Sequence, residues 1–532
     1  MRQRWRFYLP VLAFLILGWS WAFASPVGSS ADENFHLTSA WCAWGAWEDC
    51  TVESSTGLVT VPAAVGQFPC FAGGSGVEAT CLLEQEWQET FATTHVSNPT
   101  GGYPPLFHAT MRFFAGPDVE KSVVTMRMFN VAIAAAVLLW ALILAPPVVS
   151  RALALTWAIA IIPIGLFFVA SVNPSSWAII GGSTFWAFFY TLLAEPRWRS
   201  LRSSFAMLGM AVTMVLAVMA RADSVYVIVL SVVAVGIIQG FFLRNRLKSF
   251  VLLAFFSIAA IAIALRFNVG SYLSALNFSI PVGNQITDQP NPLIKVLAEI
   301  PAFLAGAFGL QEPWAQRESI SDYGVAGWVN KTFLFGLGNA NDVVLPSLVG
   351  VLVLVVVSGS LFLGLSQSPR AKLAAVAILF TGMVFQILAM RSLTTWGSWE
   401  TSSYVLYIYP RYLLPALMLT IAISLVVTPI SKPIFGKIQG YLISILLTLA
   451  ATVALMATIG RYMQGQDRSW VQFETASGWW WSWGPDPILI ICLSFVSGAI
   501  YFGAMVSLAV RFPTTPEDYA QESRQGTSGR LS

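Results

Sequence analysis

Long apolar runs recur along most of the chain, and shorter polar stretches separate them. A helix of about twenty residues matches the roughly 30 Å hydrocarbon core of a bilayer at 1.5 Å per residue. Unbroken helices also satisfy their own backbone hydrogen bonds inside lipid. The pattern therefore predicts an all-α fold, a polytopic transmembrane helical bundle of about 12 spans. After a first span within residues 1–25, the expected spans are 123–145, 153–171, 176–194, 204–220, 224–242, 249–265, 343–365, 373–390, 405–428, 439–460 and 487–508.

Two polar stretches are too long to be simple turns between spans. Residues 26–121 are glycine-rich and polar, and we interpret them as a large exoplasmic loop. Residues 266–342 form a second exoplasmic loop, in which NPLIKVLAEIPAFLAGAFGL predicts an interfacial or re-entrant helix. The other predicted segments are a signal anchor with the first span at 1–25, bundle parts at 122–265 (spans 2–7) and 343–510 (spans 8–12), and a disordered cytoplasmic tail at 511–532.

The first apolar run has an alternative interpretation. Ala22 and Ala24 stand in an A-x-A-like arrangement before Ser25, which is also typical of a cleaved signal peptide. We expect an uncleaved anchor, because the run is long and would hold the following loop at the membrane.

Charge predicts the orientation of the spans. Cytoplasmic loops are enriched in lysine and arginine, and basic residues gather in alternate connections, at 2–6, 197–202 and 244–248 for example. This alternation predicts cytoplasmic termini and exoplasmic long loops. With 56% hydrophobic and 10% charged residues, the chain is no soluble multidomain protein. The lipid bilayer is its first expected partner, and no nucleic acid is expected.

Four of the five cysteines, Cys42, Cys50, Cys70 and Cys81, lie in the first exoplasmic loop, whereas Cys492 lies in an apolar run. An even set confined to one loop predicts two disulfides on an oxidising face. The simplest pairing joins Cys42 to Cys50 and Cys70 to Cys81, although four cysteines permit three pairings. Free or metal-binding thiols are the alternative.

Two adjacent carboxylates and a histidine follow the first apolar run directly. Asp32 and His36 are four residues apart and would share one helix face, with Glu33 beside them. One carboxylate could accept a proton from an attacking hydroxyl while the other orients it, and the three side chains are also candidate ligands of a divalent metal. Alternatively, Ser30 or Asp32 simply caps a loop helix whose first turn favours acidic residues.

All three histidines of the chain, His36, His95 and His108, fall in this first loop. Together with Tyr103 of the GGYPP stretch, they are candidate substrate-binding residues. The plainer interpretations are a hydrogen-bonded interfacial histidine at His36 and a rigid proline turn that leads into the next membrane helix.

Arginines on the outer side are unusual and need a partner. Arg221 and Asp223 lie in ARADS at an outer helix junction, and Arg411 lies in YIYPRYLLPAL at the head of a later span. Such residues either pair with carboxylates or hold an anionic head group such as a phosphate. Arg411, flanked by aromatic residues and prolines, is the stronger phosphate candidate, and an interfacial snorkelling arginine is the alternative.

Six short motifs occur in order along the chain: DE-x-x-H after the first span, YPPLFH, VNPSSW, RAD, GLGNANDVVLP and PRYLLP. Together they resemble a bacterial family of polytopic membrane proteins that carry a domain of unknown function. That family is similar in layout to the C-type superfamily of membrane glycosyltransferases. The resemblance covers residues from about Pro26 to Leu425.

The resemblance implies an enzyme of the bacterial cytoplasmic membrane that transfers a sugar from a polyprenyl-phosphate donor on the exoplasmic face. The acceptor would be a cell-envelope glycan or lipid. Carried over to this chain, Asp32 is the expected base, Glu33 its neighbour, and Arg411 a candidate phosphate contact. A transporter or flippase of a lipid-linked envelope intermediate, which makes no bond, is the main alternative. An assembly scaffold that docks through the disulfide loop is a third hypothesis.

Overall fold

The computed structural model describes residues 5–240 and 343–510 with gaps, of which 396–409 and 466–477 are the longest, and a few positions between these two parts. The predicted interfacial helix, the tail at 511–532 and nearly all of the predicted span at 249–265 lie outside the described residues.

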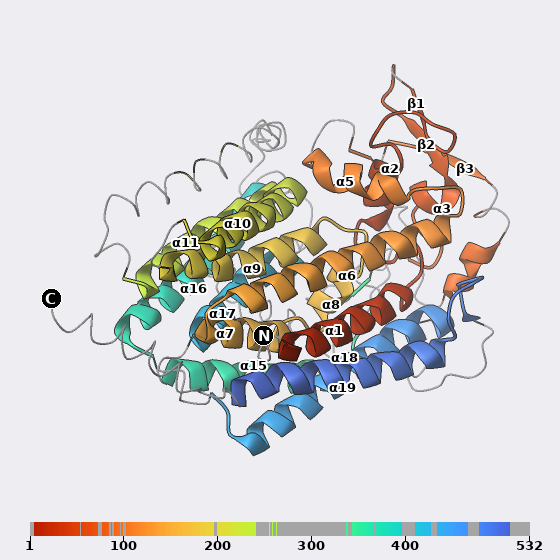
Figure 1. The fold of residues 1–532 in the computed structure, drawn as a ribbon. Coiled ribbons are helices and arrows are strands. Elements are labelled where there is room, and N and C mark those ends of the chain that lie inside the picture. The colour runs from red at the N-terminus through yellow and green to blue at the C-terminus, as the bar shows by residue number, and fades with distance from the viewer. Residues whose placement is uncertain are drawn as a thin grey trace, which may run out of the picture.

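Most of the described chain forms long apolar helices that run roughly along one direction (Figure 1). Within the described residues, seven are long and apolar enough to cross a membrane: α1 (Trp5–Phe23), α6 (Val119–Leu144), α9 (Ser175–Ala194), α10 (Leu201–Ala220), α15 (Ser347–Ser366), α18 (Lys437–Gln464) and α19 (Pro487–Val510). They are joined by α7 (Pro147–Ile159), α8 (Ile164–Val169), α11 (Val225–Ile238), α16 (Arg370–Thr395) and α17 (Pro410–Leu425). A polytopic helical bundle is thus confirmed, while the total of about 12 spans stays a prediction.

One predicted span is divided. The run at 153–171 was expected to form one helix, but α7 ends at Ile159 and α8 begins at Ile164. Pro163 lies between the two helices, and a proline inside a helix removes a backbone hydrogen bond and clashes with the preceding turn. The expectation of one continuous helix was therefore wrong here, while a membrane crossing by this run stays a prediction.

The described residues among 24–118, which we call the loop domain, gather at one end of the bundle (Figure 1). Their elements are α2 (Glu33–Trp41), β1 (Thr51–Val52), β2 (Val59–Pro62), α3 (Ala63–Gly66), η1 (Ala79–Leu83), β3 (Phe91–Thr94), α5 (Pro105–Met111) and η2 (Arg112–Phe114). The three strands form an antiparallel sheet in the order β1-β2-β3, with Thr60 opposite both Thr51 and Thr93. The all-α expectation is corrected to this extent.

Two disulfides close short loops in the loop domain. Cys42 bonds to Cys50 and Cys70 to Cys81, with Cα–Cα distances of 5.6 and 6.3 Å. The predicted pairing is confirmed, and Cys492 is free and exposed. The loop domain is also tied to α18, because the Arg461 guanidinium donates to the backbone oxygens of Phe71 and Val77, at 3.0 Å each.

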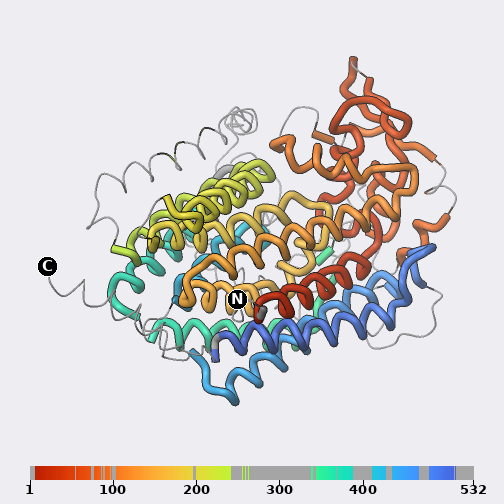
Figure 2. The backbone as a smooth tube through the Cα atoms, in the orientation of Figure 1, coloured from red at the N-terminus to blue at the C-terminus, as the bar shows by residue number. Residues whose placement is uncertain are grey.

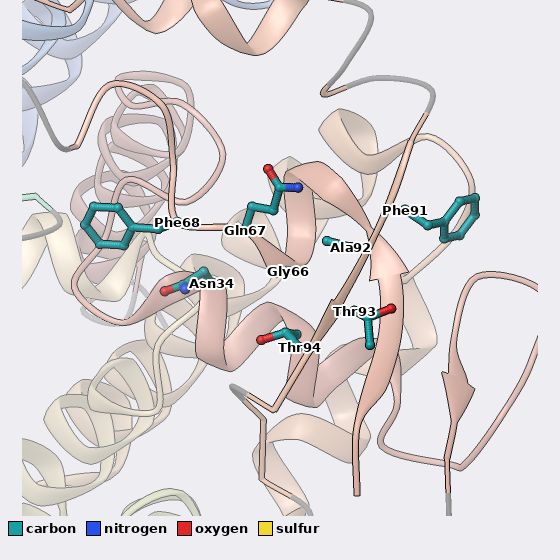
Figure 3. A pocket seen from close by; sticks show the side chains of 8 residues that line it. All are labelled: Asn34, Gly66, Gln67, Phe68, Phe91, Ala92, Thr93 and Thr94. Atoms are coloured by element: carbon teal, nitrogen blue, oxygen red, sulfur yellow. The ribbon is translucent and has the colours of Figure 1, made fainter. Parts of the chain in front are cut away.

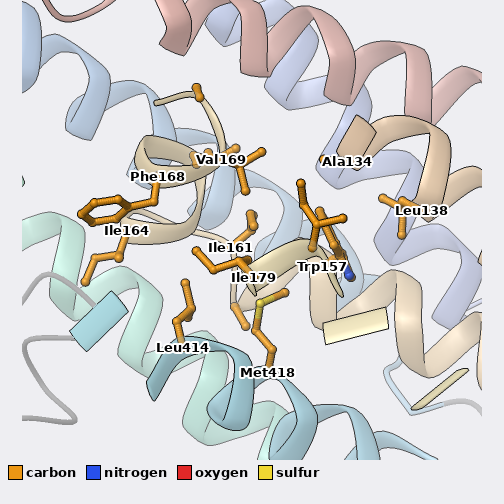
Figure 4. Close-up of a cluster of buried hydrophobic side chains, with 14 of the residues drawn as sticks. Ala134, Leu138, Trp157, Ile161, Ile164, Phe168, Val169, Ile179, Leu414 and Met418 are labelled. Carbon is orange, nitrogen blue, oxygen red and sulfur yellow. The ribbon is translucent and has the colours of Figure 1, made fainter. Parts of the chain in front are cut away.

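The first and last described helices lie side by side: α1 packs against both α6 and α19 (Figure 2). Within the bundle, α6, α7, α8, α9 and α17 bring large apolar side chains such as Trp157, Phe168 and Met418 into one buried cluster (Figure 4). Other apolar side chains face outward along the bundle, among them Leu208 of α10 and Ile445 of α18. Such exposed apolar faces suit helices that are surrounded by lipid.

Candidate functional site

Asp32 stands immediately before α2 in an unusual backbone conformation. Its φ of 58° lies in the left-handed region, and no other non-glycine residue among those described has a positive φ. Asp and Asn tolerate this region better than other side chains do, but it remains an uncommon conformation. Asp32 occupies the N-cap position, yet its side chain makes no capping hydrogen bond. The capping interpretation therefore does not account for this carboxylate.

The Asp32 carboxylate pairs instead with an arginine 379 positions later in the chain. Arg411, at the start of α17, donates from Nη2 to Oδ2 of Asp32 at 2.8 Å. The arginine side chain is only 3% exposed, whereas that of Asp32 is 55% exposed. The pair thus joins a buried cation to a carboxylate that can reach solvent or a ligand.

Glu33, the adjacent carboxylate, is completely buried and points elsewhere. Arg127 of α6 donates to both of its oxygens, at 2.8 and 3.3 Å, and the exposure of both side chains is 0%. The same guanidinium donates to the backbone oxygens of Ala22, Ser25 and Pro26. Through these hydrogen bonds Arg127 holds the end of α1 and the start of the loop domain against α6.

The remaining lone pairs of Glu33 are also used. Its oxygens accept the backbone N–H groups of Ser30 and Val172, at 3.1 Å each. In the next residue of the VNPSSW turn, the Asn173 amide donates to the backbone oxygen of Ala31 at 2.7 Å. Buried charges are tolerated when they are paired and fully hydrogen-bonded, and this network fixes the backbone on both sides of Asp32.

Arg221, the second outer arginine, lies beside the first. It follows α10, before η3 (Ala222–Ser224), and forms a two-bond pair with Asp223 at 2.6 and 3.0 Å. It also donates to the Ser175 hydroxyl at 3.2 Å. Its guanidinium carbon is 3.9 Å from the ring centroid of Tyr412, and that of Arg411 is 4.8 Å from the same centroid. One aromatic ring therefore lies against two cations.

Two of the three histidines form a buried pair next to these cations. His36 Nδ1 and His108 Nε2 are 3.2 Å apart, and one of them donates to the other. Burial lowers the pKa of His108 to about 3. Burial also lowers the pKa of His36 well below its ordinary value, and electrostatic interactions with His108, Arg411 and Arg221 lower it further. Both imidazoles are therefore neutral at pH 7.

Tyr103 completes the arrangement. Its ring centroid is 5.0 Å from that of His36 and 5.7 Å from that of Phe35. Burial raises the pKa of Tyr103 to about 12, and the nearby charges of Arg221, Arg411 and Asp32 also act on it. The phenol stays protonated at pH 7 and can donate a hydrogen bond. We call the set Asp32, Tyr103, Arg221, Asp223, Arg411 and Tyr412 the two-arginine site.

The structure does not bring every predicted residue here. His95 is exposed just after β3, and none of the described contacts joins it to the histidine pair. The three candidate metal ligands also diverge, because Asp32 pairs with Arg411, Glu33 with Arg127, and His36 with His108. Within the described part of the chain, no group of three or more His, Cys, Asp or Glu side chains could hold a metal ion.

Sequence reasoning missed Arg127 and Tyr412. Arg127 had a signal, since an ionisable residue inside an apolar span requires a buried partner. Tyr412 is adjacent to Arg411 in sequence, but nothing local indicates that its ring lies against Arg221 as well.

Comparison with known proteins adds one match. The profile of a protein family described as "Predicted membrane protein (DUF2142)" matches residues 15–420, which include α2, the VNPSSW turn and the start of α17. No curated protein and no solved structure matches the chain.

Proposed function

The chain belongs to this family of predicted membrane proteins (DUF2142), and from the two-arginine site we propose that it is a membrane glycosyltransferase. In this proposal it transfers a sugar from a polyprenyl-phosphate donor to a cell-envelope glycan or lipid on the exoplasmic face. Asp32 is the general base. Arg411 and Arg221 bind the donor phosphate.

The ion pair between Asp32 and Arg411 carries the proposal. A reactive carboxylate and a phosphate-binding cation have to lie within a few ångströms of each other for this chemistry, and here they are 2.8 Å apart. The uncommon backbone conformation of Asp32 supports a functional role, because such conformations cluster at active sites. Arg411 is nearly buried, and a buried guanidinium binds phosphate more strongly than one in water.

The chemistry follows from these positions. The Asp32 carboxylate takes the proton of the acceptor hydroxyl while that oxygen bonds to the anomeric carbon of the sugar. The bond between this carbon and the phosphate oxygen breaks, and polyprenyl phosphate leaves with the electron pair. The phosphate gains one negative charge in this step, so the two guanidiniums stabilise the product side of the reaction and the transition state that leads to it.

Donor binding would also release the base. In the structure Arg411 holds Asp32, whereas a donor phosphate would compete for the same guanidinium nitrogens. Arg221 already has Asp223 as a fixed partner, so it provides a positive field with little change of its own. Tyr103, which stays protonated, can hydrogen-bond a phosphate or sugar oxygen. Glu33, with all its oxygens occupied, positions Asp32 and does not touch the substrate.

A transfer assay tests the proposal. Purified protein in proteoliposomes is incubated with a panel of radiolabelled polyprenyl-phosphate sugars and envelope extracts, and new glycosides are counted. We expect Asp32→Asn to lower the rate by about 10²–10⁴-fold, the usual contribution of a general base. Asn tolerates a positive φ, so the variant should fold. Asp118→Asn is the matched control, since Asp118 also pairs with a cation, Lys121, but lies at the start of α6 outside the site.

The same vesicles distinguish the alternatives. Movement of labelled lipid-linked sugar across the bilayer without any new glycoside would indicate a flippase and refute the transferase. Transfer that persists unchanged in Asp32→Asn would show that Asp32 is not the base.

A further inference from the structure

Exposed aromatic side chains of the loop domain occur in two different settings. At the open hollow between α2, α3 and β3, Phe68 and Phe91 are 52% and 55% exposed, but their rings point away from the hollow in opposite directions (Figure 3). Trp44 and Phe113, which are 54% and 72% exposed, instead contact each other edge to face, with their ring centroids 4.5 Å apart. These two rings therefore form one exposed apolar surface, and the two phenylalanines at the hollow do not.

The paired rings belong to well-fixed parts of the loop domain. Trp44 lies in the short loop that the Cys42–Cys50 disulfide closes, and Phe113 lies in η2. Burying a large apolar side chain stabilises a protein by about 1.5–3 kcal/mol. A fixed pair of large rings that stays outside the protein core therefore indicates a surface that meets an apolar partner.

The position of η2 beside α6 indicates which apolar partner this is. Phe114, the neighbour of Phe113, has its ring centroid 4.8 Å from that of Phe129 in α6. The 26 residues of α6 extend about 39 Å, which exceeds the roughly 30 Å hydrocarbon core by about 9 Å. Phe129 comes ten residues after the first residue of α6, about 15 Å along the helix. Even if the whole excess length stood on the side of the loop domain, a spanning α6 would place Phe129 inside the hydrocarbon core. The η2 segment therefore lies at the edge of the bilayer.

A cation accompanies the two rings. The guanidinium carbon of Arg112 is 3.9 Å from the ring centroid of Trp47 and 5.5 Å from that of Trp44. One of its nitrogens donates to the backbone oxygen of Ala115 at 3.2 Å. In the described part of the chain Arg112 forms no ion pair, and Asp49 acts on it electrostatically from a greater distance. Tryptophan is typical of the membrane interface, and a guanidinium there can bind the phosphate of a lipid head group.

We propose that Trp44, Arg112 and Phe113 form a lipid-binding surface on the side of the bilayer that bears the loop domain. The two rings enter the boundary between head groups and acyl chains, and the Arg112 guanidinium binds a lipid phosphate. This contact holds α5, which carries His108 of the buried histidine pair and ends next to Arg112, at the level of the head groups. The inference does not depend on which reaction the two-arginine site performs.

Spin-label accessibility of the full-length protein in nanodiscs tests the depth of this surface. In a Cys492→Ser background, Phe113→Cys carries a single nitroxide, because the other four cysteines form disulfides. We expect this nitroxide to collide more often with apolar oxygen than with a water-soluble nickel chelate. Ile445→Cys, on the outward face of α18, is the reference for lipid, and Ser55→Cys, in the exposed part of the loop domain, is the reference for water, where the nickel chelate should collide more often.

Lipid retention tests the cation. Native mass spectrometry counts the phospholipid molecules that stay bound when the protein is released from phosphatidylglycerol nanodiscs. We expect Arg112→Gln to retain fewer of them than the parent protein. Arg112→Lys is the matched control, since it keeps the positive charge and should retain the parental number.

Each measurement can overturn the inference. A nitroxide at position 113 that behaves like the one at position 55 would place the surface in water. A nitroxide shielded from both reagents would show that a second copy of the chain, and not lipid, covers the surface. Equal lipid retention in Arg112→Gln and the parent protein would refute the phosphate contact. Because neither measurement uses a sugar donor, these failures are distinct from a failure of the proposed transferase function.

Discussion

At the scale of single residues, neighbouring carboxylates have opposite environments. Asp32 is half exposed and faces the cations of the two-arginine site, whereas Glu33 is enclosed by Arg127 and backbone N–H groups. Asp32 has a left-handed backbone conformation at the start of α2, and the side chains of Asp32 and Glu33 point in different directions there. The same sequence pair therefore provides one group that can react and one group that holds it in place.

This division predicts different responses to isosteric amides. Glu33→Gln leaves the Arg127 charge buried without its partner, and removing one member of a buried ion pair costs about 3–5 kcal/mol. Asp32→Asn should lower the unfolding free energy less than Glu33→Gln, because the Asp32 side chain is 55% exposed and Arg411 keeps a hydrogen bond to the Tyr412 hydroxyl. Thermal unfolding in detergent measures both. A stable Glu33→Gln protein that has lost transfer would assign the base to Glu33 instead.

The histidine pair predicts a pH dependence of stability. The pKa of His108 is about 3 in the folded protein and about 6.5 when unfolded, so below pH 6.5 the unfolded state binds more protons. Stability should therefore fall as the pH drops from 7 to 5, by about 2 kcal/mol from His108 alone. His36, whose pKa is also lowered and which faces Arg411 and Arg221, adds to the effect with the same sign.

Unfolding temperatures of variants at pH 7 and pH 5 test this dependence. His108→Gln should reduce the loss on acidification, whereas His95→Gln should not, since His95 is exposed. Equal losses in both variants and in the parent protein would mean that the pair does not control the slope.

At the scale of elements, features set by nearby residues could be predicted. Hydropathy located most of the long helices among the described residues, and the confirmed disulfides join cysteines only 8 and 11 positions apart. The strands were missed because each has two to four residues, too few to show alternation. The meeting of Asp32 with Arg411, 379 positions apart, was also beyond prediction. Such a contact depends on how the helices pack, and no local pattern encodes it.

The second disulfide predicts how the loop domain is held. Closing a loop of 11 residues stabilises a fold by about 2–3 kcal/mol in the chain-entropy estimate. Arg461 donates hydrogen bonds to the backbone oxygens of Phe71 and Val77, which both lie between Cys70 and Cys81 in the sequence. We expect Cys70→Ser/Cys81→Ser to open this region to limited proteolysis while the helical content by circular dichroism is retained. Unchanged cleavage would mean that the Arg461 contacts suffice without the disulfide.

At the scale of the whole molecule, the proposed chemistry requires the loop domain and the two-arginine site to lie on the exoplasmic side. The loop domain lies at one end of the bundle (Figure 1), and the hydrogen bond from Arg411 to Asp32 holds the two-arginine site against it. The chain enters α1 from its basic start and reaches the loop domain at the other end of that helix. By the preference of basic residues for the cytoplasm, the loop domain should face outward.

Single reporter cysteines measure this orientation in intact cells. With Cys492→Ser as the background, Ser55→Cys in the exposed loop domain should react with a membrane-impermeant maleimide. Lys437→Cys, at the exposed first end of α18, should react only after the membrane is opened, because α18 returns to the loop domain at its last turn, where Arg461 binds Phe71. The native disulfides keep the remaining cysteines unreactive. The reverse labelling pattern would put the site on the cytoplasmic face, where a donor presented on the outer leaflet could not reach Arg411.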